Sequence, residues 1–168
     1  VKDVQLGNLR VETGAGVVAA TPGVGFETIN LVSSSETNAI GQFVAEDLQT
    51  LNISGDADLT LGARAQTTNN LIVEATRYAA GLGNTQGSLT AINAAGFEGD
   101  LDITLVGDFN AGTDGTSGVN TKLTVTGGKG DDVIRVNADT IGTTDLIYAG
   151  EGNNTAVLLG NTVVNAAG

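Results

Sequence analysis

A repeat with a spacing of about 22 residues constrains the fold of this chain more than any other feature. The segment Thr28-Ile29-Asn30-Leu31 reappears one such spacing later as Thr50-Leu51-Asn52-Ile53. A longer segment, residues 48–55, returns at residues 89–96, and this offset of 41 is close to two spacings. Residues 70–73 fall near the midpoint. One face of a repeating coil is therefore expected near positions 29, 51, 72 and 92.

A second set of apolar residues lies out of phase with the first. Each of its segments alternates apolar and polar residues, which is typical of a short strand with one buried face. The set comprises Ile40, Phe43, Leu59, Leu61, Leu101, Ile103, Leu105, Leu123, Val125 and Ile147. Gly, Asn, Asp, Ser and Thr separate these segments, as expected of turns. The pattern predicts an all-β chain that folds as a right-handed parallel β-solenoid with coils of about 20–24 residues.

Stacking explains why such a repeat would be stable, because one coil cannot cover its own apolar side chains and a stack can. A length of 168 residues corresponds to about seven coils in a single domain over 1–168, although residues 1–25 hold no clear copy of the repeat. Asn30, Asn52 and Asn93 share one repeat position, so they are candidates for a ladder of side-chain amides. Residues 71–80 fit either a short helix or a strand. The chain starts without Met and has no evident caps, which suggests an internal module.

Composition narrows the possible functions. The 19 acidic and 7 basic side chains give a net charge of −12, which repels nucleic acid and attracts cations. The chain has no cysteine and no histidine, so disulfides, thiol nucleophiles, most transition-metal sites and most hydrolase triads are excluded. No apolar run reaches membrane-spanning length. We therefore expect a protein that is not an enzyme, has no transmembrane segment and binds a metal ion.

Residues 127–135, GGKGDDVIR, match every fixed position of the nonapeptide G-G-x-G-x-D-x-U-x, the calcium-binding repeat of a parallel β-roll. Residues 149–157, AGEGNNTAV, form a degenerate copy one repeat spacing later, with Asn154 in place of the aspartate. Calcium takes several hard oxygen ligands from carboxylates and carbonyls, and glycines let backbone carbonyls turn toward an ion. Two such turns on one corner of adjacent coils would supply that set.

The predicted Ca²⁺ ligands come from three turns. They are Gly128, Gly130 and Asp132 in the first motif, Gly150, Gly152 and Asn154 in the second, and Asp108 and Asp114 in the turn 107–115, which is expected one coil earlier. The alternative is that GGKGDD is a turn selected only for its shape. The acidic turns 54–58 and 96–100 are expected at another corner, where solvated surface is the simpler interpretation.

The motif and the repeats resemble a known group of proteins. GGKGDDVIR is similar to the hallmark of RTX proteins, and residues 26–40, 48–62 and 88–105 resemble the Thr- and Ala-rich solenoid of surface-layer proteins of Gram-negative bacteria. The resemblance implies a secreted, calcium-dependent structural protein that self-assembles on the bacterial cell surface, with cell-surface polysaccharide as a further possible partner. An RTX adhesin module and the solenoid part of a polysaccharide-active enzyme remain alternatives.

Overall fold

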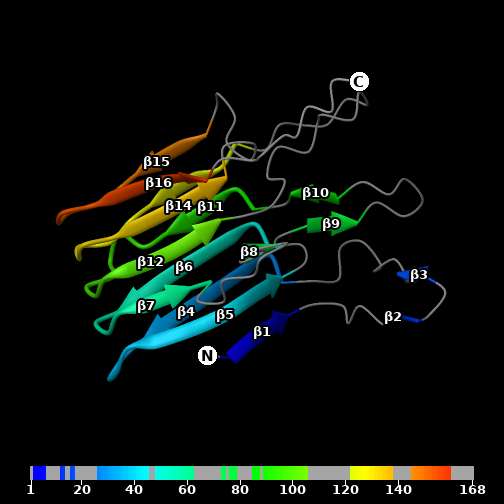
Figure 1. The fold of residues 1–168 in the computed structure, drawn as a ribbon, viewed down its shortest axis with the longest axis horizontal. Helices are drawn as coiled ribbons and strands as arrows, with labels where there is room; N and C mark the ends of the chain where they lie inside the picture. Colours follow the sequence, from blue (N-terminus) through cyan, green and yellow to red (C-terminus); the bar gives the residue numbers. More distant parts are fainter. Residues whose placement is uncertain are drawn as a thin grey trace, which may run out of the picture.

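The computed structural model describes residues 2–6, 12–13, 16–17, 26–45, 48–62, 73–74, 76–78, 85–87, 89–105, 122–137 and 145–159. Within these ranges every regular element is a strand (Figure 1). The predicted all-β class is therefore confirmed. None of these residues belongs to a helix long and apolar enough to cross a membrane.

Two parallel sheets make up the body of the fold. The seven-stranded sheet has the order β1 (Lys2–Leu6), β5 (Asn38–Ala45), β7 (Leu59–Leu61), β12 (Leu101–Leu105), β14 (Val133–Asn137) and β16 (Thr155–Leu159), with β8 (Val73–Glu74) also paired to β5. The five-stranded sheet has the order β15 (Leu146–Tyr148), β13 (Thr124–Thr126), β11 (Ala91–Asn93), β6 (Thr50–Gly55) and β4 (Thr28–Ser33). Two antiparallel pairs lie outside these sheets, namely β2 (Glu12–Thr13) with β3 (Gly16–Val17), and β9 (Thr76–Tyr78) with β10 (Thr85–Gly87).

The two sheets advance together along the chain. Each strand of the five-stranded sheet leads through a short turn into a strand of the other sheet, which gives the layers β4–β5, β6–β7, β11–β12, β13–β14 and β15–β16. Each strand pairs in parallel with its counterpart in the next layer (Figure 1). The predicted parallel stacking of short strands is confirmed, and the described residues form five layers of it.

The register corrects the predicted period. Thr28 lies beside Thr50 and Thr124 beside Leu146, and both of these steps equal the predicted spacing. Thr50, however, lies directly beside Ala91, so the offset of 41 is one layer and not two. The predicted coil face near position 72 is wrong, because Val73 belongs to β8 and pairs with Phe43. The extra residues of this step include the β9–β10 hairpin, which lies outside the stack.

The prediction for the second apolar set is also wrong in part. Leu101 pairs with Leu59 in the seven-stranded sheet, whereas Val125 pairs with Ile92 in the five-stranded sheet. These segments are therefore opposite walls of the core and not successive copies of one wall. The segments that begin at Leu101 and Leu123 are one predicted spacing apart only because of the length of the chain between them. They are not successive copies, because the strand that follows β12 in its own sheet is β14.

The core lies between the two sheets. Inward side chains alternate with outward ones along each strand, as the pleat requires. The fully buried members include Leu51, Ile53, Ile92 and Val125 from one sheet and Leu59, Leu61, Leu101, Ile103, Leu105, Ile134 and Val136 from the other. Burial of these apolar side chains is the main contribution to the stability of the stack.

The predicted ladder of asparagine side chains is present in part. Asn30, Asn52 and Asn93 are aligned in the register, and Asn52 Nδ2 donates to Asn30 Oδ1 at 2.9 Å. Asn93 Oδ1 instead accepts from the N–H of Ala95 at 3.3 Å, so the amide ladder exists between the first two layers.

The helix considered for residues 71–80 is wrong at residues 73–74 and 76–78, which are strands.

Candidate functional site

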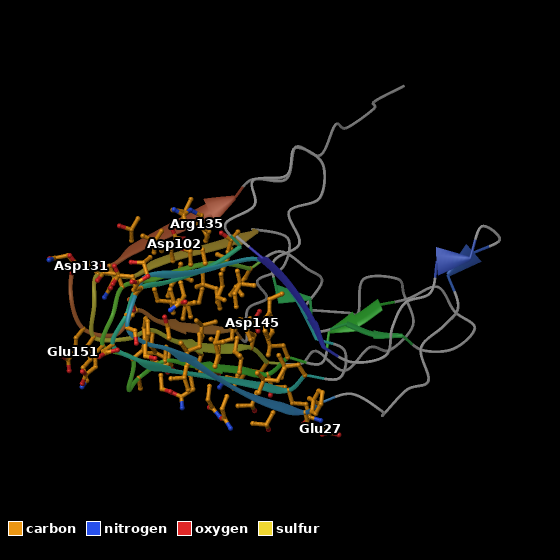
Figure 2. The ribbon with its side chains drawn as sticks, turned by 90° about the horizontal axis from the view of Figure 1, so that it is seen from below. Glu27, Asp102, Asp131, Arg135, Asp145 and Glu151 are labelled. Carbon is orange, nitrogen blue, oxygen red and sulfur yellow. The ribbon has the colours of Figure 1, made fainter. Side chains whose placement is uncertain are left out.

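The turns between the two sheets stack on one edge of the molecule. They comprise residues 34–37, 56–58, 94–100, 127–132 and 149–154, and Figure 2 shows Asp131 and Glu151 together at this end. We call this the acidic edge, defined by Glu36, Asp56, Asp58, Glu98, Asp100, Asp131, Asp132 and Glu151. Lys129 is the one basic side chain among the residues of these turns, and its Nζ lies 3.0 Å from Glu98 Oε1.

The two glycine-rich turns are neighbours, as predicted. The N–H of Gly127 donates to the carbonyl of Tyr148 at 2.8 Å, and the N–H of Glu151 donates to the carbonyl of Gly128 at 2.9 Å. The N–H of Asp132 donates to Asn154 Oδ1 at 2.8 Å. The prediction that both motifs occupy the same corner of adjacent layers is confirmed.

The layer before the motif is a different turn from the predicted one. The N–H of Lys129 donates to the carbonyl of Phe97 at 2.9 Å, and the N–H of Asp131 donates to Asp100 Oδ1 at 2.8 Å. Residues 94–100 thus hold the place expected for the turn 107–115, and they lie on the same edge as the motif and not on another corner. Asp108 and Asp114 lie outside the described residues.

Asp132 is the centre of the site, and its carboxylate points inward. The side chain is fully buried. Asp132 Oδ2 accepts from the N–H of Gly128 at 2.6 Å, within its own turn, and Asp132 Oδ1 accepts from the N–H of Leu101 at 3.0 Å, in the preceding layer. The carboxylate therefore ties the turn to itself and to the start of β12.

Burial governs the protonation of this carboxyl. Desolvation raises the pKa of Asp132 above its ordinary value, and the nearby charges of Asp100 and Asp131 raise the pKa further. The hydrogen bonds from Gly128 and Leu101 act in the opposite direction, because they favour the ionised form. A buried carboxyl held by amides between two acidic neighbours is a place where charge is costly and where a cation would be favourable.

The other predicted ligands are also engaged in contacts between layers. The carbonyl of Gly128 accepts from Glu151, and Asn154 Oδ1 accepts from Asp132, while Asn154 Nδ2 donates to the carbonyl of Glu151 at 2.7 Å. Gly150 and Gly152 have φ values of +90° and +82°, which side chains rarely adopt. A Cβ on Gly152 would also meet the carbonyl of Gly130, so the glycines permit close stacking of the two turns.

A ladder of acidic side chains runs beside the motif, and sequence reasoning missed it. Asp58 Oδ1 accepts from the N–H of Asp100 at 3.1 Å, Asp100 Oδ1 from Asp131 at 2.8 Å, and Asp131 Oδ1 from Asn153 at 2.8 Å. Each member stands shortly before a strand of the seven-stranded sheet. The sequence does hold a signal for this ladder. An acidic or amide residue stands shortly before the strand in each of the segments DADLTL, EGDLDI, GDDVIR and GNNTAV.

The ladder carboxylates are exposed, unlike Asp132. Among the described residues, no three His, Cys, Asp or Glu side chains converge as a metal-binding group. An open hollow of about 340 Å³ lies between the first two turns of the edge and is lined by Ser35, Glu36, Thr37, Asp56, Ala57 and Asp58. The acidic edge is therefore a line of separated negative charges. Each carboxylate of the ladder accepts a hydrogen bond from a backbone N–H.

Comparison with known proteins gives no relative. No family model, no curated protein and no solved structure matches the chain.

Proposed function

We propose that the chain is a structural module of an extracellular bacterial surface layer, a right-handed parallel β-solenoid that binds calcium and assembles with copies of itself. The observation that carries this proposal is the stack of parallel layers with the acidic edge along one side. The motif of residues 127–135 supports calcium as the ion. The proposed role is mechanical and not catalytic.

Calcium is proposed to bind on the acidic edge at the motif turns 127–132 and 149–154 and the turn 94–100 that precedes them. Asp100 and Asp131 lie in adjacent layers, are exposed, and have one oxygen each in an amide hydrogen bond. Carboxylates can use further lone pairs, and calcium accepts a mixed set of carboxylate, carbonyl and amide oxygens. An ion here would offset the repulsion among Asp100, Asp131 and Asp132. The predicted ligands Gly128, Gly130, Asp132, Gly150, Gly152 and Asn154 would lie around it.

The net charge supports the link between calcium and assembly. Molecules with a charge of −12 repel one another until cations screen or bridge them. Calcium on the acidic edge would lower this repulsion and would also stabilise each molecule, because an ion that binds only the folded state favours it.

Sedimentation and electron microscopy of the protein in chelator and in about millimolar calcium test this proposal. Ordered filaments or sheets that appear with calcium and dissolve in excess chelator are the expected result. A sedimentation profile and a melting curve that are both unchanged by calcium would overturn it. Magnesium at the same concentration is the control for simple screening, because magnesium demands a stricter octahedral site.

One observation favours a second candidate, an adhesin-type binding module. The outward side chains of the five-stranded sheet are uncharged in all its strands, and they include Thr28, Asn30, Thr50, Asn52, Asn93, Thr124 and Thr126. An uncharged face rich in hydroxyls and amides in so acidic a protein suits a neutral polysaccharide. A monomer that binds neutral glycans, and that loses this binding in Asn52→Glu, would favour the adhesin over the structural module.

A further inference from the structure

The turn of residues 149–154 carries an asparagine in the sequence context of a glycosylation acceptor. Residues 151–155 read EGNNT. Asn153 has a threonine two places after it and no proline between them, which is the acceptor pattern N-x-[ST]. Glu151 stands two places before it, and an acidic residue at that place is the further feature that bacterial oligosaccharyltransferases recognise. One turn of the acidic edge thus holds the extended bacterial form of the pattern.

The three-residue pattern occurs twice in the chain, and the structure separates the two copies. The other copy is Asn52-Ile53-Ser54, which has Thr50 and not an acid two places before the asparagine. Asn52 lies within β6, between β4 and β11, and its Nδ2 donates to Asn30 Oδ1 at 2.9 Å. A sugar on this nitrogen would break a contact between layers.

The Asn153 amide has no such role. Glu151, Asn153 and Thr155 are all exposed, and Figure 2 shows Glu151 at the outer end of the acidic edge. The backbone N–H of Asn153 donates to Asp131 Oδ1, but among the described residues no hydrogen bond engages its side-chain amide. A sugar on this nitrogen therefore breaks no contact of the described stack.

The neighbouring asparagine shows the contrast. Asn154 Oδ1 accepts from the N–H of Asp132 at 2.8 Å, and Asn154 Nδ2 donates to the carbonyl of Glu151 at 2.7 Å. Asn154 thus joins the two motif turns with both ends of its amide. Of the two adjacent asparagines, one holds the turn together and the other is left for chemistry.

The acidic ladder shows that this exposure follows from the place of the side chain in the turn. Asp58, Asp100 and Asp131 hold the same place in earlier layers, and all three stay exposed although a further layer follows each of them. Each uses one oxygen, Oδ1, for the N–H of the next layer. An asparagine at this place offers its oxygen for the same contact and keeps its nitrogen in the solvent. Modification of the nitrogen is therefore compatible with the stack.

The charge of Glu151 is also available to a partner. Among the described residues, the ion pairs join Lys129 to Glu98 and Arg135 to Asp102, and neither involves Glu151. A carboxylate without an ion pair at the surface can meet a cationic side chain of a transferase, and charged contacts of this kind give specificity to an encounter.

We propose that Asn153 Nδ2 accepts an N-linked oligosaccharide from a polyprenyl diphosphate carrier, transferred by a bacterial oligosaccharyltransferase. The nitrogen attacks the anomeric carbon of the first sugar. The bond from that carbon to the diphosphate oxygen breaks as the carbon–nitrogen bond forms. The polyprenyl diphosphate leaves with the electron pair, and the amide nitrogen gives one proton to a base of the transferase. Glu151 and the hydroxyl of Thr155 are the groups that the transferase recognises on either side of Asn153.

This inference rests on the proposed function only in placing the chain outside the bacterial cytoplasm, where such transferases act. Calcium and self-assembly take no part in it. A chain that is glycosylated on Asn153 but neither binds calcium nor assembles would overturn the proposed function and leave the inference standing. A chain that assembles with calcium but takes no sugar would overturn the inference alone.

Glycosylation of the purified, folded protein tests the proposal. The parent chain is incubated with a bacterial oligosaccharyltransferase and its polyprenyl-diphosphate oligosaccharide, and the products are digested with trypsin. Mass spectrometry then separates the two patterns, because Asn52 lies in the tryptic peptide 11–64 and Asn153 in the peptide 136–168. The mass of one oligosaccharide should appear on Asn153, and peptide 11–64 should keep its mass.

Four variants test the three groups of the acceptor. Asn153→Gln, Glu151→Gln and Thr155→Ala should each lose the added mass, whereas Thr155→Ser should retain it because it keeps the hydroxyl. All four positions are exposed, and circular dichroism checks that the variants keep their strands. An unmodified parent protein, a glycan on another asparagine, or full modification of Glu151→Gln would overturn the proposal.

Thr50→Glu is the matched control for the part played by the fold. It places an acid two positions before Asn52, so both patterns then have the extended form. In the folded variant Asn52 should stay unmodified, because its nitrogen is held against Asn30 between two strands. The peptide 11–64 cut from the same variant should be modified. Equal modification of Asn52 and Asn153 in the folded variant would overturn the argument that the structure selects Asn153.

Discussion

Asp131 Oδ1 accepts a hydrogen bond from the backbone N–H of Asn153 at 2.8 Å, and the residue that follows, Asp132, sends its carboxylate in the opposite direction along the stack, to the N–H of Leu101. Two adjacent aspartates of one turn thus bind the next layer and the preceding layer. The exposed carboxylate keeps contact with water, whereas the buried one does not. This difference separates the stability role of Asp132 from any ion-binding role of Asp131.

Replacement of Asp132 should therefore destabilise the fold more than replacement of Asp131. Asp132→Ala leaves the buried N–H groups of Gly128 and Leu101 without their acceptor, which should lower the free energy of unfolding by about 2–4 kcal/mol. Asp131→Ala removes an exposed acceptor and should cost less than about 1 kcal/mol. Urea denaturation in chelator measures both. Equal costs would contradict the structural role assigned to Asp132.

Stability should also depend on pH through Asp132. Burial raises the pKa of this carboxyl in the folded state, so the folded state holds its proton more tightly than the unfolded state does. The contribution of Asp132 to stability is then fully present below the unfolded pKa of about 3.9 and is lost as pH rises through the raised folded pKa.

The difference in unfolding free energy between the parent protein and Asp132→Asn isolates this group, because asparagine does not titrate. The unfolding free energy of the parent protein should fall relative to that of Asp132→Asn as pH rises from about 3 through the raised pKa. NMR titration of the Asp132 carboxyl carbon gives the pKa directly. A pKa below about 3.9 would show that the two amide hydrogen bonds outweigh burial.

Glycine substitutions should show whether the glycines of the turns are needed for close stacking of adjacent layers. Gly152 has a φ of +82°, and a Cβ there would meet the carbonyl of Gly130 in the layer before. Gly152→Ala should therefore cost about 1–3 kcal/mol. Gly96→Ala is the control, since a Cβ at Gly96 has nothing within 4 Å. A change there should be near neutral. Thermal melting of the two variants decides, and equal melting temperatures would argue against tight stacking of the turns.

Some of the fold could be predicted because certain layers follow each other without interruption. Residues 28–31 and 50–53 repeat at the same offset as the two glycine-rich motifs, and both pairs lie in adjacent layers with the predicted register. Alternation within each segment was enough to identify strands, since one face of each is buried.

The other layers could not be placed by a fixed period. The steps from Thr50 to Ala91 and from Ala91 to Thr124 contain extra chain, and a periodic search cannot distinguish a long step from two short ones. For the same reason the contact between Asp100 and Asp131, at an offset of 31, was missed. The motif also said nothing about the direction of the Asp132 carboxylate, which depends on where the N–H of Leu101 lies.

The inward column of Leu105, Val136 and Leu158 allows a test of where the core ends. Leu105→Ala should lower the free energy of unfolding by about 2–5 kcal/mol, because it leaves a cavity in a closed core. Leu158→Ala, in the same column but largely exposed, should cost less than about 1 kcal/mol at protein concentrations where the chain is monomeric. Denaturation at two protein concentrations checks this. A large cost for Leu158→Ala at the lower concentration would mean that another part of the same molecule covers that end.

Calcium should bind more weakly when the ladder carboxylates are neutralised. Asp131→Asn keeps the acceptor oxygen for the N–H of Asn153 but removes an exposed negative charge of the first motif turn, so calcium affinity should fall about tenfold or more while stability in chelator stays nearly unchanged. Asp56→Asn is the matched control, since Asp56 lies on the same edge in the second layer, away from both motif turns, and its effect should be smaller. Calorimetric titration of the two variants and of Asp132→Asn gives the comparison. If Asp56→Asn proves the most damaging, the ion binds at the hollow formed by Glu36, Asp56 and Asp58, and the motif turns serve the fold alone. If none of the three changes the affinity, calcium does not bind at the acidic edge, and the assembly that it promotes has to come from contacts elsewhere on the molecule.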